Sequence, residues 1–448
     1  MENEDIIQVE ELEEVEEQDE RDLSTQKIFT TQADAQVDSL HGRYKRGRLN
    51  IQPDYQRKFV WDAKKASLLI ESILLDIPIP IIYLAEDANN VVNVIDGQQR
   101  LTSLFSFIDG TFPDGRKFKL TGLNVFTNLK GKMYKDLEAK YQDKILEYPL
   151  RTITFTADSD PELQYEIFSR LNTGSVALND QELRNCIYRG RFNDLIKELA
   201  TNTDYLSLLG LKGPHSRMKD VELVLRFIGF YTKTYINYMP PSKAWMNDVM
   251  RENRNLDDIQ VKKLREAFKR AVTNTKTLFG EHAFRRFYLG NKDHQEGMWS
   301  DKAIVVSLFE VTMDSMARIE TTVLMRHLDA LREALINLMA TNEEFITSIS
   351  RASADRAAVN LRFRLWNEVV DSVIKDDRAD MRCFTRALKQ RLYDADPTCA
   401  ICGQHISCID DCAVDHIEQY WMGGKTIPEN ARLTHRYCNC ARDKYDKA

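Results

Sequence analysis

The sequence predicts an α+β protein with a mixed N-terminal domain, an all-helical middle region and a small Cys/His-rich module. Three observations predict this. Strand-like runs alternate with helical periodicity before residue 177, and helical periodicity with few Gly or Pro continues over 178–390. Six of the eight cysteines then fall between Cys399 and Cys440, in a segment too short for a large hydrophobic core.

The composition is that of an ordinary globular chain. Its 448 residues are 43% hydrophobic and 29% charged, which allows two or three domains. No apolar run reaches the ~20 residues needed to cross a bilayer, and the start of the sequence lacks a basic-then-apolar signal. We therefore expect a cytoplasmic protein with no membrane partner, in which clustered cysteines bind metal rather than form disulfides.

The net charge of −7 is unevenly distributed along the chain. Residues 1–22 contain twelve acidic residues and a single base, Arg21. Such a charge run is typical of a disordered tail, to which we assign residues 1–24. The alternative is that this tail mimics DNA and masks a basic groove, since the rest of the chain carries a net charge of +4.

The N-terminal domain, 25–177, is predicted from local periodicity. Apolar residues recur at helical spacing over 66–74, and the strand-like runs 81–84 and 91–95 flank a polar turn. A helix, a β-hairpin and a second helix are therefore expected in this order.

The second strand is followed directly by Asp96-Gly97-Gln98-Gln99-Arg100. A strand, a tight turn and a helix start can form an anion site, because free backbone N–H groups and the positive end of the helix dipole face the ligand. Arg100 can add a bidentate phosphate contact. The alternative is structural, with Asp96 capping the helix and Gly97 making the turn. The residues alone favour neither interpretation.

Two further polar stretches are candidate site segments. Gln56-Arg57 lies in a loop just before Trp61, and Arg170-Leu-Asn172 closes a helix. For the second stretch an ordinary helix C-cap is the simpler explanation.

The middle region, 178–390, is predicted to be helical throughout. Arg362 and Arg364 alternate there with Phe363 and Trp366, a pattern that can follow a nucleic-acid backbone. A solvated helix face with buried aromatic residues is the commoner explanation.

The C-terminal segment carries the most specific motif. It reads Cys399-Ala-Ile-Cys402, Val414-Asp-His-Ile417, Glu429-Asn430 and His435-Arg-Tyr-Cys438-Asn439. This order resembles the HNH endonuclease family, a ββα-metal fold, and we assign 391–448 to such a domain. The alternative is a purely structural zinc knuckle, but a knuckle does not require an Asp-His pair and two asparagines at these separations.

The resemblance implies a structural Zn²⁺ held by two pairs of soft ligands, each pair spaced by two residues. These ligands are Cys399, Cys402, His435 and Cys438. Rival ligands are the remaining cysteines of the segment: Cys408, Cys412 and Cys440.

The resemblance also implies a catalytic site. His416 would be the general base that takes a proton from the attacking water. Asp415 and Asn439 would hold a catalytic Mg²⁺. Asn430 would brace the loop that presents His416, and Arg442 would contact a phosphate.

The N-terminal motifs resemble the ParB-like family known as domain of unknown function 262, found in GmrSD-type, modification-dependent restriction systems and related phage-defence proteins. The matching pieces are 53–57 with Trp61, 96–100, and 168–174 with 182–184. The resemblance implies a site that binds and hydrolyses a nucleoside triphosphate of unidentified base. Gln99 and Arg100 would contact its phosphates, and Asp96 would orient a water or metal. The remaining residues of this site would be Gly97, Gln98, Gln56, Arg57, Arg170 and Asn172.

Together the resemblances imply a nucleotide-regulated DNA endonuclease of a bacterial restriction or anti-phage system, acting on phage or modified DNA. Double-strand cutting would need a homodimer or two nicking events, and DNA-modification proteins of the same system are expected partners. Two other functions stay open. One is a homing-type or unregulated endonuclease, and the other is a nucleotide-controlled DNA-binding regulator whose HNH module is inactive.

Overall fold

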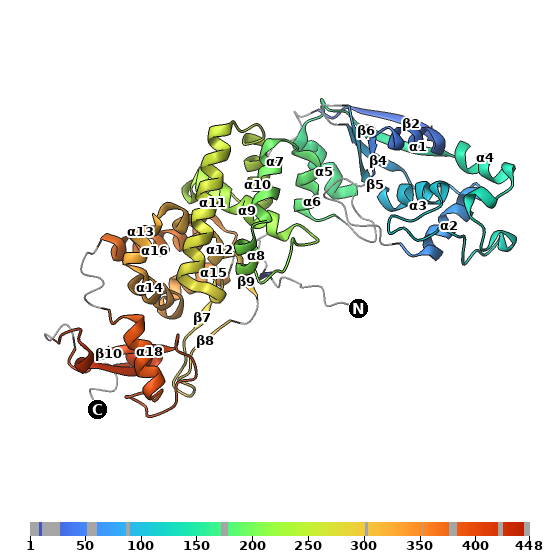
Figure 1. Ribbon diagram of the computed structural model, residues 1–448. Helices are drawn as coiled ribbons and strands as arrows, with labels where there is room; N and C mark the ends of the chain where they lie inside the picture. The colour runs from blue at the N-terminus through green and yellow to red at the C-terminus, as the bar shows by residue number, and fades with distance from the viewer. Residues whose placement is uncertain are drawn as a thin grey trace. The chain divides into compact units, whose positions relative to one another are not determined.

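The computed structural model divides into two compact units (Figure 1). The first consists of the described residues of 27–189 together with Ser216–Met218, and the second of those of 190–215 and 219–442 together with Val9–Glu10. The structure describes residues 9–10, 27–51, 61–86, 90–171, 178–300, 303–351, 353–375, 383–419 and 424–442.

The first unit is a mixed α+β fold around a five-stranded sheet. Its strands are β2 (Thr30–Gln36), β3 (Leu49–Asn50), β4 (Ile82–Glu86), β5 (Val92–Asp96) and β6 (Pro149–Phe155). Its helices are α1 (Val37–Lys45), α2 (Ala63–Leu74), α3 (Gln98–Asp109), α4 (Ala139–Glu147), α5 (Pro161–Leu171) and α6 (Asp180–Ile187). The strand order is β2-β6-β4-β5-β3, with antiparallel pairs β2/β6 and β4/β5 and parallel pairs β6/β4 and β5/β3. The predicted hairpin and its flanking helices are confirmed.

A buried carboxylate ties the loop after α3 to α2. Apolar side chains of the sheet and of α1–α4 form one core, in which Ile70 and Ile73 of α2 are fully buried. Glu71, between them, accepts backbone N–H groups at 3.0, 2.7 and 2.9 Å. The donors are Asn124, Val125 and Phe126. Burial raises the pKa of Glu71, but these hydrogen bonds outweigh it and the pKa lies below its ordinary value.

The first unit ends with α6 and a buried ion pair. Asn179 caps the helix by accepting from the Glu182 backbone N–H at 2.8 Å, and Glu182 accepts in return from the Asn179 N–H at 2.7 Å. The Glu182 carboxylate, 1% exposed, also binds the Arg217 guanidinium through two contacts of 2.9 Å. This pair explains why the short segment 216–218 belongs to the first unit.

The second unit is mainly helical. Its longer helices are α7 (Arg191–Ala200), α9 (Lys219–Lys233), α10 (Ser242–Glu252), α11 (Asp258–Phe279), α12 (Val306–Arg318), α14 (Leu328–Thr341), α16 (Arg356–Lys375) and α18 (Arg386–Ala395). Shorter ones are α8 (Thr203–Leu208), α13 (Thr321–Arg326), α15 (Glu343–Ser350) and α19 (Arg436–Cys440). Its strands are β1 (Val9–Glu10), β7 (Phe287–Tyr288), β8 (Met298–Trp299), β9 (Ile304–Val305), β10 (Cys412–His416) and β11 (Ala431–His435). The prediction of an all-helical middle region is therefore wrong at β7–β9, because two-residue strands are too short to show periodicity.

Arg362 lies in the helical core. Its guanidinium binds the Glu310 carboxylate at 2.5 Å, and Arg226 binds the other oxygen of Glu310 at 3.2 Å. Phe363 and Trp366 are each 1% exposed. The interpretation in which Arg362 follows a nucleic-acid backbone is thus wrong, because a buried guanidinium requires its counter-ion.

Within the predicted tail 1–24 the structure describes only β1, which pairs in parallel with β9. The other tail residues lie outside the described part, so their disorder and DNA mimicry stay predictions. Of the helices that the structure describes, none has the length and apolar character needed to cross a bilayer.

Candidate functional site

Residues 396–442 form a small module in the second unit. Strands β10 and β11 pair antiparallel, from Cys412 opposite His435 to His416 opposite Ala431, and α19 follows directly. Its described core contains five buried residues, three of them cysteines: Cys399, Ile406, Cys412, Leu433 and Cys438. So small an apolar core supplies little stability, and other interactions must hold the module together.

Four of the predicted metal ligands converge in this module. The ligand atoms of Cys399, Cys402, His435 and Cys438 all lie within 4.8 Å of one another. His435 Nδ1 is 3.4 Å from the sulfur of Cys402 and 3.9 Å from that of Cys438. Metal–ligand bonds of ~2.1 to ~2.3 Å in a tetrahedron place such atoms roughly 3.6 Å apart, so the cluster can hold a metal such as Zn²⁺.

The turn that carries the first two ligands is closed by Gly403, directly after Cys402. The backbone N–H of Gly403 donates to the Cys399 carbonyl oxygen, and Gly403 has a φ of 74°. This left-handed conformation favours glycine, because a Cβ strains the backbone there. The tight turn brings the chain back so that Cys399 and Cys402 face the same point.

The thiols of the cluster differ in acidity. Burial raises the pKa of Cys399, but backbone N–H groups that include those of Cys402 and His435 lower it to about 7. Burial raises the pKa of Cys438 above its ordinary value. A bound cation would favour both thiolates, because metal ligation requires the deprotonated form.

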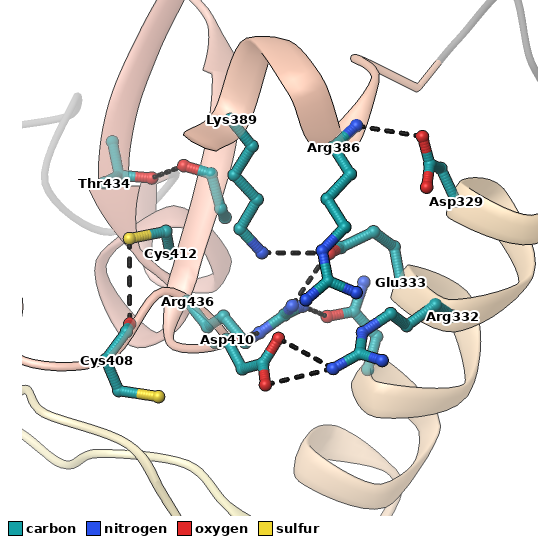
Figure 2. Close-up of polar contacts among 12 residues, drawn as sticks. Asp329, Arg332, Glu333, Arg386, Lys389, Cys408, Asp410, Cys412, Thr434 and Arg436 are labelled. Carbon is teal, nitrogen blue, oxygen red and sulfur yellow. Dashed lines mark hydrogen bonds and ion pairs between the residues drawn. The ribbon is translucent and has the colours of Figure 1, made fainter. Parts of the chain in front are cut away.

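The rival cysteines lie outside this cluster. Cys412 directs its thiol to the carbonyl oxygen of Cys408 at 3.7 Å (Figure 2), and burial raises the pKa of Cys412 to about 12. Cys440 is exposed on α19. Among the described residues, the cluster therefore consists of the four predicted ligands without a rival.

His416 is the last residue of β10. Its Nε2 lies 3.0 Å from the hydroxyl oxygen of Thr426, and its ring centroid lies 4.4 Å from that of Phe384. Burial lowers the pKa of His416, although the Asp415 carboxylate acts in the opposite direction. The imidazole is therefore mainly neutral at pH 7, which is the state that a general base requires.

Asp415 is bound by two arginines. Arg442 donates to both carboxylate oxygens at 3.0 Å, and Arg432 donates to Oδ2 at 2.9 Å. Arg442 also donates to the carbonyl oxygens of His416 and Ile417, at 2.8 and 3.1 Å. Arg442, which the resemblance implied as a phosphate contact, thus uses its guanidinium for hydrogen bonds within the protein.

The Asp415 carboxylate still fits a cation. Its Oδ1 accepts from Arg442 alone among the described residues, whereas Oδ2 accepts from both arginines. A carboxylate oxygen has two acceptor sites, so Oδ1 retains one. Carboxylate and amide oxygens, as offered by Asp415 and Asn439, are the ligand types that Mg²⁺ prefers.

His416 and Asn439 border a single cavity of ≈ 180 Å³, whose lining does not include Asp415. Asn430 lies elsewhere, in the loop between the strands. It accepts from the Glu418 N–H at 2.8 Å and donates to the carbonyl oxygens of Glu418 and Lys425 at 3.0 and 2.9 Å. These bonds tie together the two ends of the loop that follows His416.

Buried ion pairs join the module to α14 (Figure 2). Arg332 binds both oxygens of Asp410 at 3.1 Å. Glu333, the next residue of α14, binds Arg436 at 2.7 Å and the Lys389 ammonium at 2.9 Å. Because Arg436 opens α19 directly after the ligand His435, α14 fixes the orientation of the helix that carries Asn439. No local motif marked these residues, since each pair joins distant parts of the sequence.

The 96–100 turn is built around a glycine. Asp96 ends β5 and Gly97, with a φ of 105°, precedes α3. A Cβ on Gly97 would lie 2.4 Å from Cδ1 of Ile82, so a larger residue would strain the backbone and also force the buried Ile82 side chain to shift. The predicted strand, tight turn and helix start are confirmed.

Arg100 is directed inward. Its guanidinium binds Asp96 at 2.5 Å and donates to the carbonyl oxygens of Pro80 and Ile81. Gln99 accepts the backbone N–H of Trp61 at 3.3 Å. The arginine predicted to contact a phosphate is therefore 13% exposed and holds the turn together.

Of the other predicted nucleotide-site residues, the structure describes Gln98 and Arg170. Gln98 begins α3 beside the turn. Arg170 pairs with Glu166 on its own helix at 2.7 Å and, within the described ranges, makes no polar contact with Asp96 or Arg100. The remaining predicted residues lie outside the described part: Gln56, Arg57 and Asn172.

Residues 37–189 match the sequence family described as GmrSD restriction endonuclease, N-terminal domain. The match ends where the first compact unit ends, and it confirms the predicted resemblance for this part of the chain. No curated protein and no solved structure matches the chain.

Proposed function

We propose that this protein is a metal-dependent DNA endonuclease of a restriction or phage-defence system. Its HNH-type module would cut DNA, and the N-terminal unit would control cutting through a bound nucleotide. The observation that carries this proposal is the shared cavity of His416 and Asn439 beside a Cys₃His cluster. It occurs in a chain whose N-terminal part matches a restriction-endonuclease family.

His416 acts as the general base in this proposal. The Thr426 hydroxyl and the Phe384 ring fix the imidazole, and burial keeps it neutral. It takes a proton from the water that attacks the scissile phosphorus, a role that contributes typically 10²–10⁴-fold to the rate.

Asp415 and Asn439 would hold Mg²⁺, which stabilises charge on the scissile phosphate and the leaving oxygen. Arg432 keeps the carboxylate oriented through Oδ2, as hydrogen-bonded partners of metal ligands generally do. The Cys₃His cluster would hold a structural Zn²⁺ that stabilises the hairpin and α19.

The N-terminal unit would bind a nucleoside triphosphate at the start of α3. Because Arg100 is engaged with Asp96, the phosphates would rely first on the positive end of the α3 dipole and on backbone N–H groups at the start of this helix. Nucleotide could regulate cutting only through different affinities for the active and inactive states. A cytoplasmic homodimer that acts with DNA-modification proteins completes this proposal.

The test is cleavage of plasmid DNA in Mg²⁺ by wild type and His416→Ala. Unmodified, methylated, glucosylated and phosphorothioated DNA are each offered with and without each nucleoside triphosphate. We expect His416→Ala to cut about 10²–10⁴-fold more slowly. His405→Ala, which changes an exposed histidine of the same module, is the matched control. Equal cleavage by wild type and His416→Ala would overturn the catalytic assignment.

The two arginines on Asp415 favour a second candidate, a nucleotide-controlled DNA-binding regulator with an inactive module. Nucleotide-dependent DNA binding by a wild type that never cuts would establish it. Cutting without nucleoside triphosphate hydrolysis, in wild type and Asp96→Ala alike, would instead identify an unregulated or homing-type endonuclease.

A further inference from the structure

The cavity beside His416 and Asn439 is bordered by cationic side chains that the cleavage chemistry leaves unused. They come from α14, α18 and α19, and we refer to this space as the charged cavity. The four cations are Arg332, Arg386, Lys389 and Arg436.

The carboxylates of the charged cavity do not balance these cations. Lys389 and Arg436, 5% and 1% exposed, share the single carboxylate of Glu333. Arg332 pairs with Asp410, and the third carboxylate, Asp329, accepts the backbone N–H of Arg386 at 2.9 Å. Four cations therefore face three carboxylates, which leaves one positive charge in excess. Arg332, Lys389 and Arg436 are buried and share the cavity with the three carboxylates, so the excess charge is that of Arg386, which is exposed.

Among the described residues, two arginines that line the cavity have side-chain donors without a partner. Arg332 is only 6% exposed, and its buried Nε makes no hydrogen bond. The guanidinium of Arg386 pairs with no group among the described residues. Arg386 and Lys389 are three residues apart on α18, and their side chains extend from the same side of the helix (Figure 2). Arg386 is thus an exposed cation that has no side-chain partner among the described residues, beside a buried cluster in which three cations accompany three carboxylates.

We propose that the charged cavity binds a phosphodiester group of the DNA strand, adjacent to the one that is cut, and that Arg386 positions it. A phosphodiester carries one negative charge and presents oxygen acceptors, which match the excess charge and the unused donors. The cavity also contains His416 and Asn439, so a strand held there passes the cleavage site. This inference rests on the proposed nuclease function.

The test compares Arg386→Ala with Arg391→Ala. Arg391 is an exposed arginine of the same helix that does not border the cavity, so both changes remove one positive charge from α18. Binding of a short DNA duplex is measured in Ca²⁺ over a series of salt concentrations, and cleavage is measured in Mg²⁺. Arg386→Lys keeps the charge and shows whether the planar guanidinium matters.

For Arg386→Ala we expect Kd and KM to rise about tenfold, kcat to stay within about twofold, and the salt slope to fall by about one. Arg391→Ala should change each quantity by less than about twofold. Arg386→Lys should restore the salt slope and only part of the affinity. Equal effects of the two alanine changes, or a loss in kcat alone, would overturn the proposal.

Two further arms separate the alternatives. If wild type does not cut, the nuclease proposal fails, whereas the difference in duplex affinity between the two variants still decides the cavity. Binding of a fluorescent ATP analogue should be the same in Arg386→Ala and wild type. If Arg386→Ala abolishes ATP binding and leaves duplex binding intact, the cavity takes a nucleotide and the DNA assignment is wrong.

Discussion

In both candidate sites an arginine guanidinium binds an aspartate carboxylate and two main-chain carbonyl oxygens. Arg100 does so with Asp96 in the first unit, and Arg442 with Asp415 in the C-terminal module. The aspartates differ in access, since the Asp96 side chain is 47% exposed and that of Asp415 10%. The same type of ion pair therefore leaves the aspartate accessible to solvent at the turn of the first unit and buries it in the hairpin of the C-terminal module.

The two sites also differ in what supports them. The Asp96 turn lies on a sheet whose apolar core extends through four helices. The Asp415 hairpin has five buried core residues and depends on its Cys/His cluster and on ion pairs to α14. The first site should therefore survive changes that dismantle the second.

The largest expected effect is that of Cys438→Ser. Structural zinc sites contribute about 10 kcal/mol or more to folding, so the loss of one ligand should unfold residues 396–442 and leave the first unit intact. Hydrogen exchange on the full chain, together with its zinc content, measures this. Cys408→Ser is the matched control, because Cys408 lies outside the cluster. Full protection of the module in zinc-free Cys438→Ser would contradict the prediction.

Breaking the attachment to α14 should have the next largest effect. Glu333→Gln leaves Lys389 and Arg436 without their shared carboxylate, which should destabilise the docked module by about 3 kcal/mol. The exchange protection of β10 and β11 reports it. Asp371→Asn removes an exposed pair with Lys375 and should cost at most about 0.5 kcal/mol. Equal losses in the two variants would show that the buried network has no special role.

The two arginines themselves can be compared through cation binding. Arg442→Gln removes a positive charge from Asp415 and should raise the affinity for Mn²⁺ about tenfold. Arg100→Gln should leave this affinity unchanged, because its aspartate is not the proposed ligand. Calorimetric titration without DNA measures both. An unchanged or weaker affinity in Arg442→Gln would show that Arg442 does not oppose the cation.

The smallest expected effect concerns pH and the first unit. The folded pKa of Glu71 is depressed, so its carboxylate contributes stability that is fully present above the unfolded value near 4.5 and is lost as pH falls through the folded pKa. Glu71→Gln should cost about 1 kcal/mol at pH 7 and progressively less below pH 4.5. Urea unfolding at a series of pH values measures this. Glu138→Gln is the control: Lys140 also lowers the pKa of Glu138, but this pair is exposed and screened by solvent, so the pH profile should change much less.

The parts of both sites that local spacing determines could be predicted from the sequence. Pairs of ligands separated by two intervening residues located the metal cluster, and a strand followed by Asp-Gly located the turn. The pairing of Asp96 with Arg100 has the i,i+4 spacing of neighbours on a helix and could have been foreseen.

The groups that engage the module's charged residues could not be foreseen. Arg332 meets Asp410 across 78 residues and Glu333 meets Arg436 across 103. Such pairs follow from how helices pack and leave no periodic pattern. For the same reason the family resemblance suggested Arg442 as a phosphate contact, and its ion pair with Asp415 was not predicted.

The spacing of the metal ligands has a consequence for synthesis of the chain. One pair lies at 399 and 402 and the other at 435 and 438, with both strands of the hairpin between them. A nascent chain whose Cys438 is still inside the ribosome has neither the complete set of metal ligands nor Asn439 available for folding. By then the helices before α18 have already emerged and can fold. An interrupted translation product would therefore contain the first unit without a complete C-terminal module, and under the proposed function such a product could not cut DNA.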